Sequence, residues 1–306
     1  TYSTSNISAN ETVTATYTIA SNGACSGSTA DKSFTVNAAP SAGVLSGTTT
    51  LCDNGTTTFS STVSGGTWTG ATTGVATINS STGVVSGVSA GTSVMTYTVS
   101  GSGGCSDATD TRTATVTAAP NAGSISGTQS ICKNASTTFS SSGDQGGAWT
   151  SGSTGIATVN STTGEVNGIS AGNATITYTV TGSGGCSDVT STRTVTVNDL
   201  PTADITNNTG TSELTCNVTT INVTASGGTS YNWSDGTTNA NKNITGSAKY
   251  FVSVSDANSC TDVDSLHITI NNTPPVADAG ADFTKTCTQN SMGGTIGTNY
   301  LSAHTY

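Results

Sequence analysis

The chain has 306 residues, of which only 8% are charged, 5% are aromatic and 37 are glycine. Its formal net charge is -10, and its few basic residues are scattered, which excludes a basic surface for nucleic acid or an anionic membrane. No apolar run approaches the roughly 20 residues that cross a bilayer, so we expect any secretion signal or anchor to lie outside these residues.

Internal repetition divides the chain, and its abundant Val, Ile and Thr favour strands rather than disorder. Residues 43–120 align with residues 123–201; for example, "GTTTLCDNGTTTFSST" matches "GTQSICKNASTTFSSS". The residues before this pair repeat only the end of the unit, and a divergent unit follows the pair. The expected domains are residues 1–39 (the C-terminal part of a domain), 40–119, 120–200, 201–273 (divergent) and 274–306 (the N-terminal part of a domain).

Each repeat shows short alternating runs separated by Gly, Ser, Asn and Asp turns, the pattern of an all-β sandwich. Seven strands, A to G, are typical of an immunoglobulin-like sandwich. In the repeat at 120–200 they are predicted at residues 124–130, 136–141, 147–150, 156–160, 165–169, 173–180 and 192–198. Proline at each boundary indicates short, stiff linkers, so the tandem array is expected to form an elongated rod.

Five aromatic residues recur at matching places in the repeats. Three tryptophans lie on predicted strand C and two tyrosines on predicted strand F: Trp68, Trp149, Trp233, Tyr97 and Tyr178. An exposed aromatic ring could stack on a sugar. One large aromatic residue per small sandwich more often fills the space between the sheets, so we assign these residues to the cores.

Eight cysteines occur singly, at Cys25, Cys52, Cys105, Cys132, Cys186, Cys216, Cys260 and Cys287. The absence of any CxxC motif disfavours zinc, and one or two isolated cysteines per domain indicate structural disulfides in an oxidising compartment. Two connectivities are open. Pairing within each domain would join Cys52 with Cys105, Cys132 with Cys186, and Cys216 with Cys260.

The strand assignment favours the other connectivity. It places the first cysteine of a domain at the turn from A to B and the second in the connection from F to G, at the opposite end of the sandwich. A strand spans about 20 Å, whereas bridged Cα atoms lie about 4.4 to 6.8 Å apart. Bridges across the junctions would join Cys52 with Cys186 and Cys132 with Cys260, which leaves Cys25, Cys105, Cys216 and Cys287 to pair with neighbouring segments.

Catalytic chemistry finds little support in the residue types. Neither of the two closely matching repeats contains histidine, which argues against a nucleophilic triad there. We expect His267 to face solvent and His304 to be a terminal residue. The acidic residues of the repeated loop are expected to be turn residues: Asp107, Asp110 and Asp188.

Calcium is the one cofactor that the sequence suggests. Asp256, Asp262 and Asp264 surround Cys260, and carboxylates on a loop at a domain junction could bind this ion. They lack the DxDxDG spacing of a dedicated calcium loop. We therefore expect no cofactor, with calcium at these three residues as the alternative.

Two kinds of resemblance add to this interpretation. The segments "GVVSGVSAGTSVMTYTV" and "GEVNGISAGNATITYTV" resemble bacterial Ig-like domains of the Big_2 type. The divergent unit, with "YNWSDG" and "VSVSDANSCTD", is similar to the SprB-type and PKD-like repeats of very large Bacteroidetes surface proteins. This resemblance implies cell-surface adhesins or gliding-motility filaments exported by type IX secretion. It also implies O-glycosylation at Ser265, within an Asp-Ser-Leu triplet.

The expected function is a non-catalytic stalk or filament segment of a large, secreted bacterial cell-surface adhesin. Its partners would be other segments of the same protein or identical chains, with surface polysaccharide or other cells as further partners and no membrane contact. Two alternatives stay open. One is a self-assembling filament subunit whose partial domain is completed by strands of another chain. The other is the accessory carbohydrate-binding array of a secreted enzyme.

Overall fold

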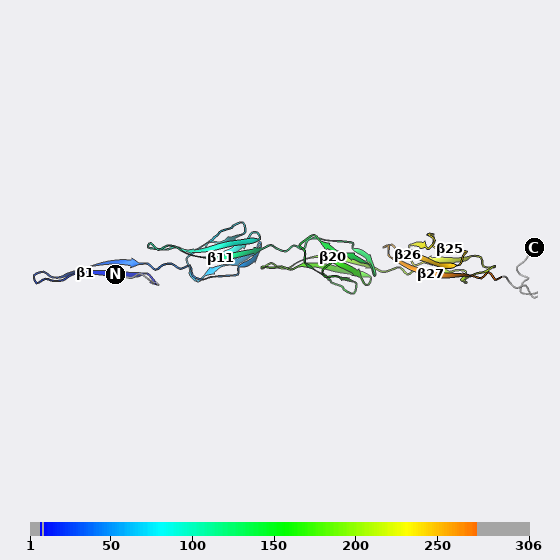
Figure 1. The fold of residues 1–306 in the computed structure, drawn as a ribbon, viewed down its shortest axis with the longest axis horizontal. Coiled ribbons are helices and arrows are strands. Elements are labelled where there is room, and N and C mark those ends of the chain that lie inside the picture. The colour runs from blue at the N-terminus through cyan, green and yellow to red at the C-terminus, as the bar shows by residue number, and fades with distance from the viewer. Residues whose placement is uncertain (1–6, 8, 274–306) are drawn as a thin grey trace, which may run out of the picture. The chain divides into compact units, whose positions relative to one another are not determined.

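The computed structural model describes residues 7 and 9–273, and within them every regular element is a β-strand (Figure 1). The chain divides between Val197 and Asn198 into two compact units, which we describe separately. The predicted fifth domain at 274–306, with Cys287 and His304, lies outside the described residues. The fold is all-β, with immunoglobulin-like sandwiches in tandem.

The first unit begins with a hairpin of β1 (Glu11–Ile19) and β2 (Ser28–Val36). The two strands pair antiparallel, with Tyr17 opposite Ala30, and form a two-stranded sheet. Their side chains are almost all exposed, because no second sheet covers the hairpin within the described residues.

Nine strands build the first sandwich: β3 (Leu45–Ser46), β4 (Thr50–Cys52), β5 (Thr56–Thr58), β6 (Ser60–Ser61), β7 (Thr67–Gly70), β8 (Ala76–Ile78), β9 (Val84–Gly87), β10 (Gly91–Val99) and β11 (Ala108–Thr117). One sheet has the order β4-β11-β10-β7, and it faces a sheet of order β5-β9-β8 and the short pair β3-β6. The strand β4 runs parallel to β11, which places Cys52 opposite Thr117 at the end of the sheet.

The second sandwich repeats this arrangement with β12 (Ile125–Ser126), β13 (Ser130–Cys132), β14 (Ser136–Thr138), β15 (Ser140–Ser141), β16 (Ala148–Ser151), β17 (Ala157–Val159), β18 (Glu165–Gly168), β19 (Gly172–Val180) and β20 (Val189–Asn198). Its sheets have the orders β13-β20-β19-β16, β14-β18-β17 and β12-β15. All seven predicted strands are present, but the first two are each split into two shorter strands.

The split of the first strand follows from Gly127. Its φ of +126° suits glycine alone, and a Cβ there would lie 2.6 Å from the carbonyl oxygen of Thr138. The chain turns at this residue, so β12 pairs with β15 in one layer and β13 crosses to β20 in the other. Strand β13 therefore forms the edge of that sheet, beside β20, and carries Cys132 at its end.

The aromatic residues predicted for the cores are buried in them. The rings of Trp68 and Tyr97 lie 4.8 Å apart, and those of Trp149 and Tyr178 lie 4.6 Å apart. The hydroxyl of Tyr178 donates to the carbonyl oxygen of Asp144 and accepts from the backbone N–H of Gly147. This satisfies the one polar atom that burial of the tyrosine would otherwise leave unpaired.

An arginine on the last strand of each of these sandwiches holds the first strand in place. In the second sandwich, Arg193 donates to the carbonyl oxygens of Ile125 at 2.8 Å and Gly127 at 3.1 Å. Its guanidinium carbon lies 5.8 Å from the centre of the Phe139 ring. Arg112 makes the equivalent contacts in the first sandwich.

The second unit contains the third sandwich: β21 (Asp204–Asn207), β22 (Glu213–Leu214), β23 (Ile221–Ser226), β24 (Ser230–Trp233), β25 (Asn241–Ile244), β26 (Ala248–Ser255) and β27 (Thr261–Ile270). Its two sheets have the orders β22-β27-β26-β24 and β21-β23-β25. Trp233 is 2% exposed in the core between them and donates from Nε1 to the carbonyl oxygen of Asn239.

Candidate functional site

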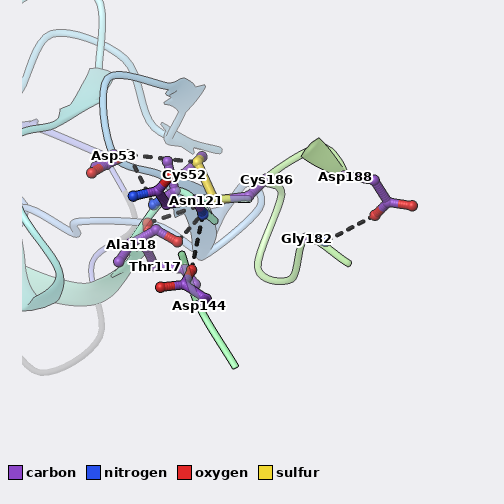
Figure 2. Close-up of a disulfide and its surroundings, with 10 residues drawn as sticks. Cys52, Asp53, Thr117, Ala118, Asn121, Asp144, Gly182, Cys186 and Asp188 are labelled. Atoms are coloured by element: carbon purple, nitrogen blue, oxygen red, sulfur yellow. Dashed lines mark hydrogen bonds between the residues drawn. A yellow bond between two sulfur atoms is a disulfide. The ribbon is translucent and has the colours of Figure 1, made fainter. Parts of the chain in front are cut away.

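A disulfide joins the first and second sandwiches of the first unit. It links Cys52, the last residue of β4, to Cys186, in the loop between β19 and β20 (Figure 2). The two Cα atoms are 4.8 Å apart, although the cysteines are 134 positions apart in the sequence. The bond therefore fastens the end of one domain to the beginning of the next.

The strand topology explains this pairing. Strand β4 ends beside the end of β11, where the first sandwich passes into the linker to the second. The loop between β19 and β20 lies at the end of the second sandwich that faces this linker: Cys186 Sγ is 3.5 Å from the carbonyl oxygen of Ala118. Pairing of Cys52 with Cys105 and of Cys132 with Cys186 within each sandwich is wrong, because those cysteines lie at opposite ends of their sandwiches.

The loop that carries Cys186 is closed by its own polar groups. Asp188 accepts a hydrogen bond at 2.8 Å from the backbone N–H of Gly182 (Figure 2). The N–H of Cys186 donates to the carbonyl oxygen of Ser183. Gly184 has a φ of +59°, and a Cβ there would lie 2.0 Å from Thr117 Oγ1. Glycine at this position lets the loop approach the preceding sandwich closely.

Two carboxylates order the linker, one from each sandwich. Asp53, which follows Cys52, accepts from the backbone N–H of Ala119 at 3.1 Å. Asp144 accepts from the N–H of Asn121 at 2.9 Å, and its own N–H donates to the carbonyl oxygen of Asn121. The sequence analysis missed both residues, although a carboxylate directly after a junction cysteine was a signal for Asp53.

The other cysteines fall into two groups. Cys132 and Cys260 are each disulfide-bonded, and the pairing of one with the other stays a prediction. Cys25, Cys105 and Cys216 are free thiols. The alternative bond between Cys216 and Cys260 is therefore wrong.

The three calcium candidates in the third sandwich, Asp256, Asp262 and Asp264, accept hydrogen bonds from backbone N–H groups. Asp256 accepts from the N–H groups of Asn258 and Cys260 and closes the turn before β27. Asp262 and Asp264, on β27, accept from the N–H groups of two residues at the start of the sandwich, Ala203 at 3.0 Å and Ile205 at 2.8 Å. Among the described residues, no cluster of three or more His, Cys, Asp or Glu could hold a metal.

The remaining predicted residues are distributed over loops and strands. Asp107 and Asp188 each close a loop, as expected of turn residues, by accepting from a glycine N–H. Asp110 was wrongly assigned to a turn, because it lies within β11. His267 and Ser265 are exposed on β27, and glycosylation of Ser265 stays a prediction.

A pocket of about 480 Å³ opens on the second sandwich beside Trp149 and Tyr178. Its lining is otherwise mostly Ser, Thr and Gly, and it contains no charged side chain. Phe139 also lines the pocket, and all three aromatic residues are 5% exposed or less, so their rings present almost no face to it. The site therefore offers hydroxyl groups but no platform for a sugar ring.

The described part of the chain contains no helix long and apolar enough to cross a membrane. The family described as Bacterial Ig-like domain (group 2) matches residues 112–192, from within β11 to within β20. No curated protein matches the chain.

Several solved structures are similar in part. The C-terminal 282-residue fragment of intimin, in complex with the intimin-binding domain of the translocated intimin receptor, is 19% identical, with a TM-score of 0.34 over 55% of this chain and 66% of that one. Surface layer protein SbsC, domains 1–6, is 17% identical, with a TM-score of 0.24 over 84% of this chain and 44% of that one. Drosophila N-cadherin EC1-4 is 13% identical, with a TM-score of 0.22 over 85% and 84%.

Proposed function

We propose that this chain is a structural segment of the stalk or filament of a large, secreted bacterial surface adhesin, of the kind used in attachment or gliding motility. The observation that carries the proposal is the disulfide between Cys52 and Cys186, which fastens consecutive sandwiches to each other. A bond within a domain would stabilise that domain alone. A bond between domains transmits tension past the linker without unfolding either core.

The location outside the cytoplasm is supported by the disulfides, since such bonds persist in oxidising compartments. The match of residues 112–192 to bacterial Ig-like domains agrees with a bacterial surface protein. The few charged residues and the Ser- and Thr-rich strand faces suit a solvated spacer. We propose that the segment is not an enzyme and takes no cofactor, and that its partners are further segments of the same protein or identical chains.

Extension of single molecules under force tests this role. The disulfide encloses 134 positions, and an extended chain spans at most about 3.3–3.6 Å per residue, so it shields roughly 440–480 Å of chain from extension. The comparison uses the intact chain and its Cys52→Ser/Cys186→Ser variant. In both, the other cysteines are replaced by serine, or by alanine at buried Cys260.

We expect the variant to release roughly 450 Å more chain than the disulfide-bonded protein when the first unit unfolds completely. A third sample, the disulfide-bonded protein pulled in reducing buffer, should behave like the variant. Equal extension of the bonded and unbonded proteins would show that the junction bond carries no load, and the proposed function would fail.

A further inference from the structure

A second junction in the first unit, between the β1–β2 hairpin and the first sandwich, has the same architecture. Among the described residues it lacks an edge strand equivalent to β4. A pocket of about 640 Å³ lies between the end of β2 and the loop from β10 to β11. The free thiol of Cys105 borders it, and Sγ lies 3.7 Å from the carbonyl oxygen of Asn37 and 3.8 Å from that of Ala38. Cys186 lies 3.7 Å and 3.5 Å from the corresponding oxygens of Thr117 and Ala118 at the next junction.

The glycines of the loop from β10 to β11 and of the loop from β19 to β20 show where this strand would lie. Gly184 packs on Thr117, and Gly103 packs on Asn37 in the same way. The next glycine differs: a Cβ on Gly185 would lie 3.5 Å from Cα of Leu51 in β4, whereas a Cβ on Gly104 would have no atom of the described residues within 4 Å. The pocket beside Gly104 is therefore the place that β4 occupies at the other junction.

The hairpin of β1 and β2 corresponds to the last strand pair of the first sandwich, β10 and β11. Its register matches that of β10 and β11, with Tyr17 at the position of Tyr97. Tyr97 is 5% exposed in its core, whereas Tyr17 is 70% exposed. Phe34 is likewise 48% exposed, and the outer edge of β2 pairs with no strand among the described residues.

We propose that this pocket receives a parallel edge strand that ends in a cysteine, and that Cys105 forms a disulfide with that cysteine. The strand would come from the N-terminal half of the same sandwich, upstream in the parent protein. The inference rests on the proposed function, because it makes the junction disulfide a repeated device. It assigns to residues 35–37 the parallel pairing that residues 115–117 make with β4.

The chemistry is an ordinary thiol–disulfide exchange. Cys105 and the incoming cysteine each lose a proton, and together they pass two electrons to an oxidised disulfide such as glutathione disulfide, which leaves as two thiols. Parallel pairing in the register of Thr117 and Cys52 would set the new cysteine beside Asn37, next to Cys105.

The occupant is identified by what the hairpin lacks. The exposed face needs a complete second layer and not a single strand, since Tyr17 and Phe34 occupy core positions. Lys32 stands where Arg112 holds the first strand of its sandwich. The N-terminal half of the same domain supplies both the layer and the first strand, whereas a lone strand from a second copy would supply only the edge.

A graft tests the proposal directly. A copy of residues 41–87, which carries its own copy of Cys52, replaces residues 1–6 of the intact chain, and the protein is oxidised in a glutathione redox buffer. Non-reducing peptide mapping should find Cys105 bonded to the copied cysteine. Alkylation of Cys105 should fall at least tenfold relative to the same graft with the copied cysteine changed to serine.

The native bond between Cys52 and Cys186 serves as the internal reference. If that bond forms and amide exchange shows β1 and β2 protected, but Cys105 remains equally reactive in both grafts, this inference is overturned while the proposed function stands. If the bond between Cys52 and Cys186 does not form, the proposed function itself fails.

A peptide measurement keeps the test decisive if the graft does not fold. A peptide of residues 41–63, activated at Cys52 as a pyridyl disulfide, is added to the unmodified chain. Cys105 should react at least tenfold faster than Cys25, relative to their rates with a small pyridyl disulfide. An unchanged ratio contradicts the strand site. Chains that instead link to one another through Cys105 would assign the site to a second copy and overturn the proposed source.

Discussion

Arg112 and Arg193 are the only arginines in the chain, and each reaches from the last strand of its sandwich to carbonyl oxygens of the first strand. The Nε atom of each is buried without a hydrogen-bond partner, and the hydrogen bonds to these carbonyl oxygens come from the terminal nitrogens of the guanidinium. Sequence analysis could not find this role, because the acceptors are backbone atoms more than sixty positions away and carry no residue signature.

Substitution of Arg193 by methionine tests this tether. The apolar stem would still pack on Phe139, but the carbonyl oxygens of Ile125 and Gly127 would lose their donors. We expect the free energy of unfolding of the second sandwich to fall by about 1–3 kcal/mol in urea titrations. Arg193→Lys should recover less than half of the loss, because an ammonium lacks the planar fork.

The control for this substitution is Thr192→Val, on the exposed face of the same strand. It should leave the urea midpoint nearly unchanged. Equal stability of Arg193→Met and the unmodified protein would contradict a tethering role.

Asp235 provides a pH-dependent contact in the third sandwich. Hydrogen bonds from Lys242 and then Thr237 lower the pKa of its carboxyl from the ordinary value of 3.8 to about 2. Because the folded state lowers the pKa, the stabilisation is complete above the ordinary value and is lost as the pH falls through about 2. The carboxylate is exposed, so the effect on stability should be small.

We expect Asp235→Asn to lower the melting temperature of the third sandwich slightly at neutral pH. The difference from the unmodified protein should shrink as the pH falls from 3.8 to about 2. Thermal melts at a series of pH values, with amide exchange to isolate this sandwich, measure it. A difference that stays constant across that range would rule out the titration of Asp235 as its source.

At the scale of elements, the alternation of Val, Ile and Thr was enough to predict all seven strands of the second sandwich. It was not enough to show where β12 turns into β13, since a change of layer depends on the positive φ of Gly127, and the sequence contains many glycines. Asp110 was misplaced for a related reason, because a polar residue on the exposed face of a long strand resembles a turn residue. The junction bond was predictable from strand direction alone, since Cys52 and Cys105 lie at opposite ends of a sandwich.

The loop that carries Cys186 makes a separate prediction at this scale. In Gly184→Ala, the new Cβ would lie 2.0 Å from Thr117 Oγ1, so the loop would have to withdraw from the first sandwich. We expect the bond between Cys52 and Cys186 to form several-fold more slowly in a glutathione redox buffer, as followed by quenched peptide mapping.

Gly146→Ala is the matched control for Gly184→Ala. Gly146 also has a positive φ, +86°, but none of the residues that the structure describes would lie within 4 Å of a Cβ there. Gly146→Ala introduces backbone strain like that of Gly184→Ala but no steric clash. The bond between Cys52 and Cys186 should therefore form at close to the rate of the unmodified protein. Equal slowing by both substitutions would attribute the effect to strain and not to contact across the junction.

At the scale of the whole molecule, the junction bond couples two cores that would otherwise unfold as separate domains. Hydrophobic clusters around Trp68 and Trp149 are distinct, and a linker of only a few residues separates them. Repeat proteins of this kind gain stability from each unit and from each interface between neighbours. A disulfide across the interface adds to the stability that comes from the interface and leaves the cores themselves unchanged.

The free energy by which the disulfide stabilises the first unit can be measured. In the chain-entropy account, a bond closing a loop of 134 positions stabilises the folded first unit by up to about 5 kcal/mol against complete unfolding. Cys52→Ser/Cys186→Ser should lower the free energy of unfolding of both sandwiches of the first unit. Amide exchange in urea should show the two sandwiches opening independently in the variant and together in the bonded protein, while exchange in the third sandwich stays the same. Independent opening in the bonded protein as well would mean that the bond joins the sandwiches without coupling their stability.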